Sequence, residues 1–206
     1  EAAVRDACGL EPSAAAVRVR QWLEGQHAEF APVLDLDLRT DPVSVLDLSV
    51  GASLISGDAR ENAEPALTKR VFAAMREAHV RVSIGRYDEP RLLYVTPSFA
   101  AGPGDTDEWR TIHLGLDLFA EAGTPVHAPL DGTVHAFADN DSPLDYGPVI
   151  ILQHAAADGT EFFTLYGHLS RESLNPLRVG QRVPRGERIA TLGAPAVNGG
   201  WTPHLH

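Results

Sequence analysis

Apolar residues recur at helical spacing in two stretches of the first half of the chain. Residues 14–24 follow Ser13, a residue type that favours helix N-caps, and they end at Gly25. A second stretch begins at Pro65, which suits the first turn of a helix. Its apolar positions are Leu67, Val71, Met75 and Ala78. We therefore predict two helices here, both as parts of the scaffold.

Alternating and continuous apolar runs in the same half predict strands. Residues 34–38 alternate leucine with aspartate, which is the period of a half-buried strand. Residues 43–50 form a second apolar run after a proline. Residues 80–87 and 92–96 flank a polar turn sequence, as the two arms of a hairpin would. These strands are also expected to be scaffold.

The pattern changes at residues 99–110, where glycine, proline, small and acidic residues predict a linker. Beyond it, short apolar runs are separated by turn residues, and none is long or periodic enough for a good helix. These runs are residues 133–138, 149–154, 161–168, 179–183 and 189–192, with a hairpin-turn signal at Asp158-Gly159. We expect an α+β chain, with an N-terminal α+β segment of unknown role (1–98) and a β-rich domain with an antiparallel or barrel-like sheet (111–206).

Composition narrows the possible partners. The 206 residues are 44% hydrophobic, which is enough for a proper core, and the formal net charge is −11. Nucleic acid and anionic membranes are therefore poor electrostatic partners. The single cysteine, Cys8, cannot form an internal disulfide, and no stretch resembles a signal peptide or a membrane span, so we expect a cytoplasmic protein. Because the sequence lacks an initial methionine and stops at a candidate ligand, we expect a fragment truncated at its C-terminus.

Histidine and aspartate gather in three short motifs of the second half. His113 and Asp117 flank Gly115, His168 follows Tyr166-Gly167, and two further histidines, His204 and His206, close the chain. On a straight strand the first pair would lie about 13 Å apart, too far to share an ion, so the chain must bend and Gly115 suits the bend. The closing pair would project from one face of a strand roughly 7 Å apart, so one or both could bind the ion.

Four motifs together resemble the lysostaphin-type zinc metallopeptidases, peptidase family M23. They are His113-x-Gly115-x-Asp117, the turn from Gly123 to Gly132, Tyr166-x-His168-Leu169 and His204-x-His206. The resemblance covers residues 111–206 in order and spacing. It implies a zinc-dependent metalloendopeptidase that cleaves a peptide amide bond, with zinc held by His113, Asp117 and His206. It also implies that His168 and His204 are the catalytic imidazoles.

A closer resemblance concerns the surroundings of this domain. The amino-acid sequence at residues 144–148, 166–174 and 197–201 is similar to the middle region of large bacterial fusion proteins. Such proteins join a kinase-like domain, a lysostaphin-type domain and an aminotransferase, so covalently linked domains of these kinds are implied partners beside a peptide substrate. Trp201-Thr202-Pro203 replaces the small residues that usually precede the last histidine pair, which separates this chain from secreted cell-wall enzymes.

Two other interpretations remain open from the sequence. The clustered residues could form a closed, four-ligand zinc site that only holds the fold. Alternatively, the domain could be a non-catalytic binding or docking module that retains the peptidase fold inside a multidomain enzyme. The remaining histidines are expected to be surface or packing residues, with His154 the best candidate for a supporting role; they are His27, His79, His127, His135 and His154.

Overall fold

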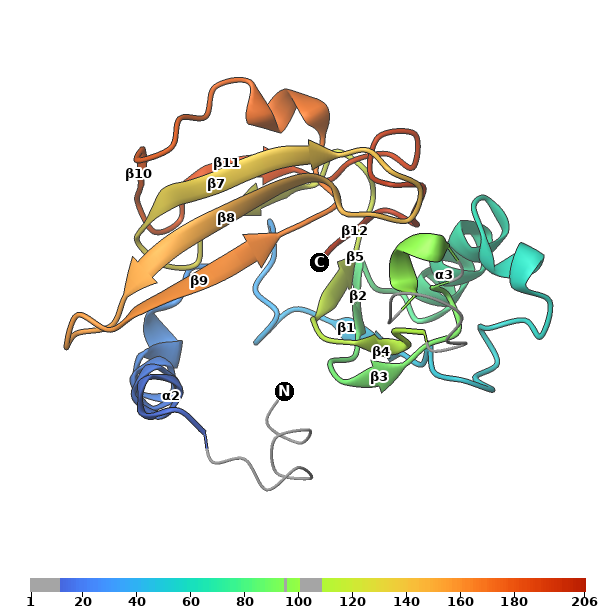
Figure 1. Cartoon of the computed structure of the whole chain (residues 1–206). Coiled ribbons are helices and arrows are strands. Elements are labelled where there is room, and N and C mark those ends of the chain that lie inside the picture. The colour runs from blue at the N-terminus through green and yellow to red at the C-terminus, as the bar shows by residue number, and fades with distance from the viewer. Residues whose placement is uncertain (1–11, 95, 101–108) are drawn as a thin grey trace.

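Four β-sheets and two α-helices make up the part of the chain that this computed structural model describes, residues 12–94, 96–100 and 109–206 (Figure 1). The helices are α2 (Ala14–Gln26) and α3 (Ala66–Glu77). The expected α+β class is confirmed, with strands dominating the second half. Four short 3-10 helices connect these elements: η1 (His27–Glu29), η2 (Ala59–Asn62), η3 (Pro97–Phe99) and η4 (Arg171–Leu174).

The sheet that carries the site is built from both halves of the sequence. Its strands, in spatial order, are β1 (Val43–Leu46), β2 (Val82–Gly85), β5 (Asp117–Phe119) and β12 (His204–Leu205). β1 and β2 run parallel, whereas β5 is antiparallel to both β2 and β12. The strands of residues 1–98 and 111–206 therefore hydrogen-bond to one another across the expected linker, of which residues 101–108 lie outside the described part of the chain.

The second four-stranded sheet belongs entirely to the second half. Its order is β10 (Arg182–Val183), β7 (Gly132–Asn140), β8 (Gly147–Ala155) and β9 (Glu161–Tyr166), and every pairing is antiparallel. The turn predicted at Asp158-Gly159 joins β8 to β9, and Gly159 has the positive φ of 82° that favours glycine there. Two small antiparallel sheets pair β6 (Pro125–His127) with β11 (Arg188–Thr191) and β3 (Glu89–Pro90) with β4 (Ile112–His113).

Two clusters of buried apolar side chains hold these layers together. The larger cluster lies among the strands of the second half, and Leu34 and Val82 reach it from the first half. The smaller cluster joins α3 to the strands through Val71, Met75 and Phe119. Both clusters therefore combine residues from the two sides of the expected linker.

Both predicted helices are confirmed, although they contribute differently. Ser13 caps α2 by accepting a hydrogen bond from the backbone N–H of Ala16, and no residue of this helix is buried. In α3 the helically spaced Leu67, Val71 and Met75 are buried. The first helix is an outer element, whereas the second is part of the core.

The strand predicted at residues 34–38 is wrong, since the structure has only isolated bridges at Leu34 and Leu36. Its leucines are packed against the core, but the backbone turns at residues 37–41. There the carbonyl of Asp37 accepts hydrogen bonds from Thr40 and Asp41. The alternation reflects burial, while the aspartates favour a turn.

The hairpin predicted for residues 80–87 and 92–96 is also wrong. β2 pairs with β1 and β5, and β3 pairs with β4, so within the described residues of the two predicted arms no pairing joins one to the other. Pairing with distant strands has replaced the local hairpin. The change matters for the site, because it places residues 85–91 beside His113 and Asp117.

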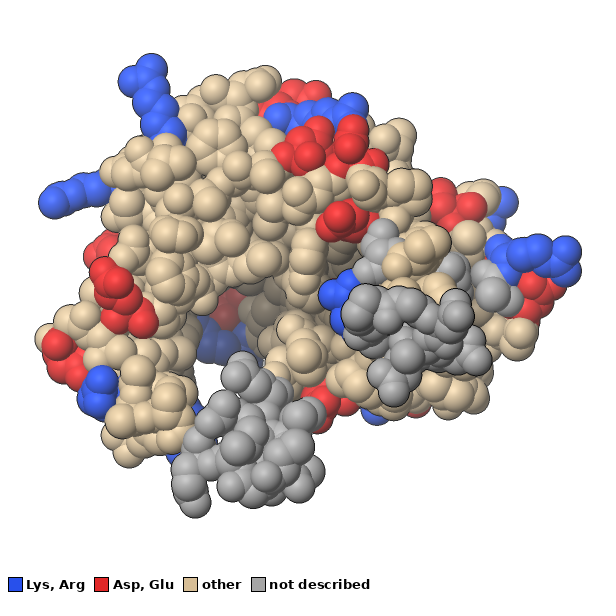
Figure 2. Space-filling model, in the orientation of Figure 1, with Lys and Arg blue, Asp and Glu red and all other residues tan. Residues whose placement is uncertain are grey.

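The described sheets do not close into a barrel, so the barrel-like alternative is not observed. Figure 2 shows acidic and basic side chains interspersed around this face of the molecule, with few charges over β7 to β9. Within the described residues, no helix has the length and apolar character needed to cross a membrane.

Candidate metal centre

Strand register brings the motif residues together. β12 runs antiparallel to β5 with His204 opposite Phe119 and Leu205 opposite Leu118, so His206 comes next to Asp117. β4 ends at His113, and the chain bends through residues 114–116 before β5 begins at Asp117. Residues almost ninety positions apart thus face one pocket, as the resemblance implied.

Gly115 permits this approach for a different reason from the one expected. Its φ is outside the positive region that favours glycine, so unusual backbone angles do not explain it. A Cβ at this position would instead lie 2.4 Å from the His206 ring. The absence of a side chain at Gly115 therefore makes room for His206.

Three potential ligand atoms lie at the mutual distances expected of a metal site. Asp117 Oδ1 lies 3.2 Å from His113 Nε2 and 3.2 Å from His206 Nδ1, and these two nitrogens are 3.0 Å apart. Zinc bonds of about 2.0–2.1 Å in tetrahedral geometry would place ligand atoms about 3.3 Å from one another. The three side chains therefore fit a zinc ion, and His113, Asp117 and His206 form a possible metal-binding group.

The other two motif histidines lie beside this group. His204 Nε2 is 3.5 Å from Asp117 Oδ1, and the His168 and His204 rings have their centroids 4.3 Å apart. His168 adopts a left-handed backbone with φ 62°, which is uncommon for a residue with a side chain. All five predicted site residues are therefore brought together.

Backbone carbonyls orient three of the imidazoles. Because a carbonyl can only accept, the Nδ1–H of His113 donates to Arg86, that of His168 to Asn198 and that of His204 to Thr202. The distances are 3.1, 2.8 and 2.6 Å respectively. Each contact leaves Nε2 of a neutral ring free to bind a metal ion or accept a proton.

Burial sets the charge of the site. It lowers the pKa of His168 well below its ordinary value and also lowers that of His204, so both rings are neutral near pH 7. Burial alone would raise the pKa of Asp117, but His204, His113, His206 and Arg91 together hold it well below its usual range. The Asp117 carboxylate anion thus lies beside two neutral rings, those of His168 and His204.

A cleft of about 450 Å³ opens over these residues. The second half of the chain contributes Tyr146 and Trp201 to its lining, and the first half contributes Leu48, Leu93 and Tyr94. Burial raises the pKa of Tyr94 to about 12, so this phenol stays protonated. The N-terminal segment therefore forms one wall of the cleft, which the sequence did not predict.

None of the five histidines expected to be surface or packing residues lines this cleft. His154 is buried on the other four-stranded sheet, where its Nδ1–H donates to the carbonyl of Asp131 at 2.7 Å. It packs close to Gly132, whose added Cβ would come within 2.8 Å of the ring. His154 thus supports the β7–β8 sheet and does not contact the metal-binding group.

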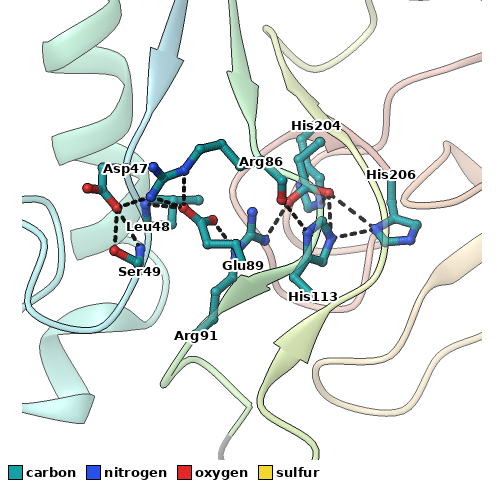
Figure 3. A network of polar contacts seen from close by, with 10 residues as sticks. Asp47, Leu48, Ser49, Arg86, Glu89, Arg91, His113, His204 and His206 are labelled. Carbon is teal, nitrogen blue, oxygen red and sulfur yellow. Dashed lines mark hydrogen bonds and ion pairs between the residues drawn. The ribbon is translucent and has the colours of Figure 1, made fainter. Parts of the chain in front are cut away.

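Sequence reasoning missed the charged residues behind the site. Glu89 and Arg91 are buried next to each other (Figure 3), and Arg91 also forms an ion pair with Asp117. Both lie in a sequence that has the composition of an exposed turn. Nothing in the local pattern distinguishes them from surface charges, because their burial depends on the pairing of β3 with β4.

The second half of the chain matches a known family. Residues 111–206 match the model of peptidase family M23. An uncharacterized metalloprotease of Haemophilus influenzae is 40% identical over 94 residues, covering 46% of this chain and 18% of that protein. A protein of Neisseria meningitidis serogroup B named DD-carboxypeptidase/endopeptidase Mpg is 38% identical over 98 residues, covering 48% of this chain and 20% of that protein. The matched segment supports a metallopeptidase-type hydrolase, and the match spans about a fifth of the length of these relatives.

Solved structures give more distant similarities. A zinc-containing peptidase from Vibrio cholerae has 26% identity and a TM-score of 0.39, over 58% of this chain and 35% of that one. The catalytic domain of lysostaphin from Staphylococcus simulans has 27% identity and a TM-score of 0.37, over 52% of this chain and 72% of that one.

Proposed function

We propose that this chain is a zinc-dependent hydrolase of the metalloendopeptidase type that cleaves a peptide amide bond. The observation that carries the proposal is the convergence of His113 Nε2, Asp117 Oδ1 and His206 Nδ1 within bonding reach of one ion. Two imidazoles and one carboxylate form a three-ligand set of the kind found in catalytic zinc sites, which keep one position open. The match of residues 111–206 to a peptidase family supports the same reaction class.

The remaining site residues fit roles in proton transfer. When bound, zinc would supply Lewis-acid chemistry and a water whose pKa is about 7. His168 and His204 are neutral, with Nδ1–H donated to a carbonyl, so Nε2 of either ring is available to accept the proton of the attacking water. A protonated Nε2 would then donate to the oxyanion or to the leaving amine.

The cleft suits an extended peptide. Tyr94, Tyr146 and Trp201 place aromatic surface beside the histidines, and Leu48 and Leu93 extend the apolar wall. One relative is named a DD-carboxypeptidase/endopeptidase, so peptides containing D-amino acids are appropriate first substrates beside ordinary peptide amides. A cytoplasmic location and covalently linked kinase-like and aminotransferase domains remain further parts of this proposal and rest on the sequence alone.

The test combines metal analysis with a hydrolysis screen on the purified chain. We expect about one zinc ion per chain. We also expect amide hydrolysis that stops on chelation and returns when zinc is added. Zinc binding without hydrolysis of any peptide would favour the docking module that retains the peptidase fold. A chain that binds no zinc at full supply would contradict the metal centre itself.

A further inference from the structure

A line of alternating charges runs from Asp47 through Arg86 and Glu89 to Arg91, beside the histidines of the metal-binding group (Figure 3). Arg86 pairs with Asp47 and with Glu89, Glu89 pairs with Arg91, and Arg91 pairs with Asp117. The outer members are partly exposed, whereas the side chains of Glu89, Arg91 and Asp117 are only 1%, 4% and 2% exposed. The inner part is thus a buried ion-pair network that ends on a candidate zinc ligand.

Asp117 divides its two oxygens between two groups of partners. Oδ2 accepts a hydrogen bond from Arg91 Nη1 at 2.6 Å. Oδ1 faces the rings of His113, His204 and His206 at 3.2 to 3.5 Å. The carboxylate plane is therefore fixed, with one oxygen committed to the guanidinium and the other directed at the ion position.

We propose that Arg91 is a positioning residue of the metal centre, which holds Oδ2 of Asp117 so that the carboxylate offers Oδ1 alone to the metal ion. This role rests on the proposed zinc site. Carboxylates that bind metals are commonly held by outer hydrogen bonds, and removing these partners typically costs about 10- to 100-fold in metal affinity. Arg91 would impose single-oxygen coordination and leave a position of the ion open.

The guanidinium is suited to this task because it has donors in a rigid fork. Nε donates to Glu89 Oε2 at 2.8 Å while Nη1 reaches Asp117, so one planar group bridges two carboxylates. Glu89 also balances the charge of Arg91, so the support adds no net positive charge behind a divalent ion. A lysine carries its three donors on one nitrogen and lacks the planar fork, so it could not reproduce this bridge through two separate nitrogens.

This role gives the N-terminal segment a part in the site. Arg91 belongs to residues 1–98, and the carbonyl that orients His113 comes from Arg86 in the same segment. Both contacts depend on β2 pairing with β5 and on β3 pairing with β4. Two of the three candidate ligands are therefore oriented by residues outside the segment that matches the peptidase family.

The experiment compares Arg91→Met, Arg91→Lys and a matched control, Arg70→Met, in the full chain. Arg70 is a half-buried arginine of α3 whose guanidinium donates to the carbonyl of Leu54 and to Asn62, and it does not line the cleft. For each protein we would measure zinc affinity by chelator competition, the visible spectrum of the cobalt-substituted protein, and urea unfolding without metal. Cobalt is the probe because its visible absorption weakens as the coordination number rises above four.

We expect Arg91→Met to bind zinc about 10- to 100-fold more weakly, with weaker cobalt bands because Asp117 can then bind through both oxygens. Arg91→Lys should lie between this variant and wild type in both measurements. Arg70→Met should keep the affinity and the cobalt spectrum of wild type even where it unfolds at lower urea.

Wild-type affinity and spectrum in Arg91→Met would overturn the positioning role while leaving the zinc site intact. If Arg91→Met does not fold, Arg91→Lys decides: a lysine variant identical to wild type in both measurements overturns the role. A wild-type chain that binds no zinc would overturn the zinc site and this role together, which separates the two failures.

Discussion

At the scale of single residues, the closing histidine pair shows how two similar side chains occupy different positions. His206 Nδ1 lies 3.0 Å from His113 Nε2, as two ligands of one ion would. His204 is fully surrounded, stacked on Phe119 with centroids 5.0 Å apart and next to His168. We therefore assign His206 as a metal ligand and His204 as a proton-transfer group, and this assignment remains a prediction.

Alanine substitutions separate these roles. His206→Ala should lower zinc content and stability, because it removes a ligand and metal binding is coupled to folding. His204→Ala should keep its zinc and lose about 100-fold or more in hydrolysis rate, as should His168→Ala. Zinc content is measured beside hydrolysis rate for all three. Equal zinc loss in the His204 and His206 variants would show that both bind the ion and would favour a closed structural site.

The space at Gly115 leads to a second prediction. Gly115→Ala should displace the His206 ring, because the new methyl group would lie 2.4 Å from it, and zinc affinity should fall while the rest of the fold is retained. Gly57→Ala is the matched control, since a Cβ there has no atom within 4 Å. Zinc titration and circular dichroism measure the two effects. Unchanged affinity in Gly115→Ala would mean that His206 is not held at this position.

At the scale of elements, short-range patterns predicted local structure well and pairing poorly. The apolar runs that became β7, β8 and β9 lie next to one another in sequence and pair in that order, with a turn signal between the last two. β2 instead finds its partners about forty residues before and thirty-five residues after it. Periodicity carries no information about which distant strand is chosen, so the expected hairpin was wrong.

The same distinction between local sequence patterns and distant contacts applies to the site. The five motif residues could be predicted because their types and spacings resemble a family, and the structure places them together. Arg91 could not be predicted, since its partner Asp117 is 26 residues away, and the two meet only through the non-local pairing of β3 with β4 and of β2 with β5. The sequence therefore could not predict the ion pair between Arg91 and Asp117, because this pair depends on tertiary contacts.

The β7–β8–β9 sheet contains a buried histidine with a testable pH response. Burial lowers the pKa of His154, so the folded protein holds it neutral. Below the ordinary pKa of about 6.5 the unfolded chain binds this proton more readily than the folded protein does. Its contribution to stability is therefore present above about pH 6.5 and is lost as the pH falls toward the lower folded pKa.

His154→Gln should remove this response. Relative to wild type, the variant should lose less free energy of unfolding between pH 8 and pH 5.5, because glutamine does not titrate. Urea unfolding of both proteins at the two pH values gives the comparison. An identical loss in both proteins would show that other groups cause the pH dependence.

At the scale of the whole molecule, the two halves of the sequence share one sheet and both cores. β5 lies between β2 and β12, and Phe119 packs with Leu46, Leu67 and Val71 of the first half. The division at residues 99–110 is a change of sequence character, and it remains a prediction as a domain boundary. The structural connection gives a direct way to test it.

A fragment of residues 111–206 should be less stable than the full chain. It would lose β1 and β2 from a four-stranded sheet and expose apolar residues that pack on α3. It should also bind zinc more weakly, because Arg91 and the carbonyl of Arg86 are absent. Urea unfolding and zinc competition against the full chain check both effects. A fragment that equals the full chain in both would establish an autonomous domain.

Trp201 gives the cleft an optical signal of its own. Its ring lies 6.2 Å from that of His168 and 6.1 Å from that of Tyr94, so it stands where a peptide would replace water. The other tryptophans lie elsewhere: Trp22 packs on Phe162, and Trp109 is 43% exposed. The wavelength of indole fluorescence shifts with the polarity around the ring. In a variant whose only tryptophan is Trp201, this wavelength would therefore report whether a peptide occupies the cleft, even when no bond is cut.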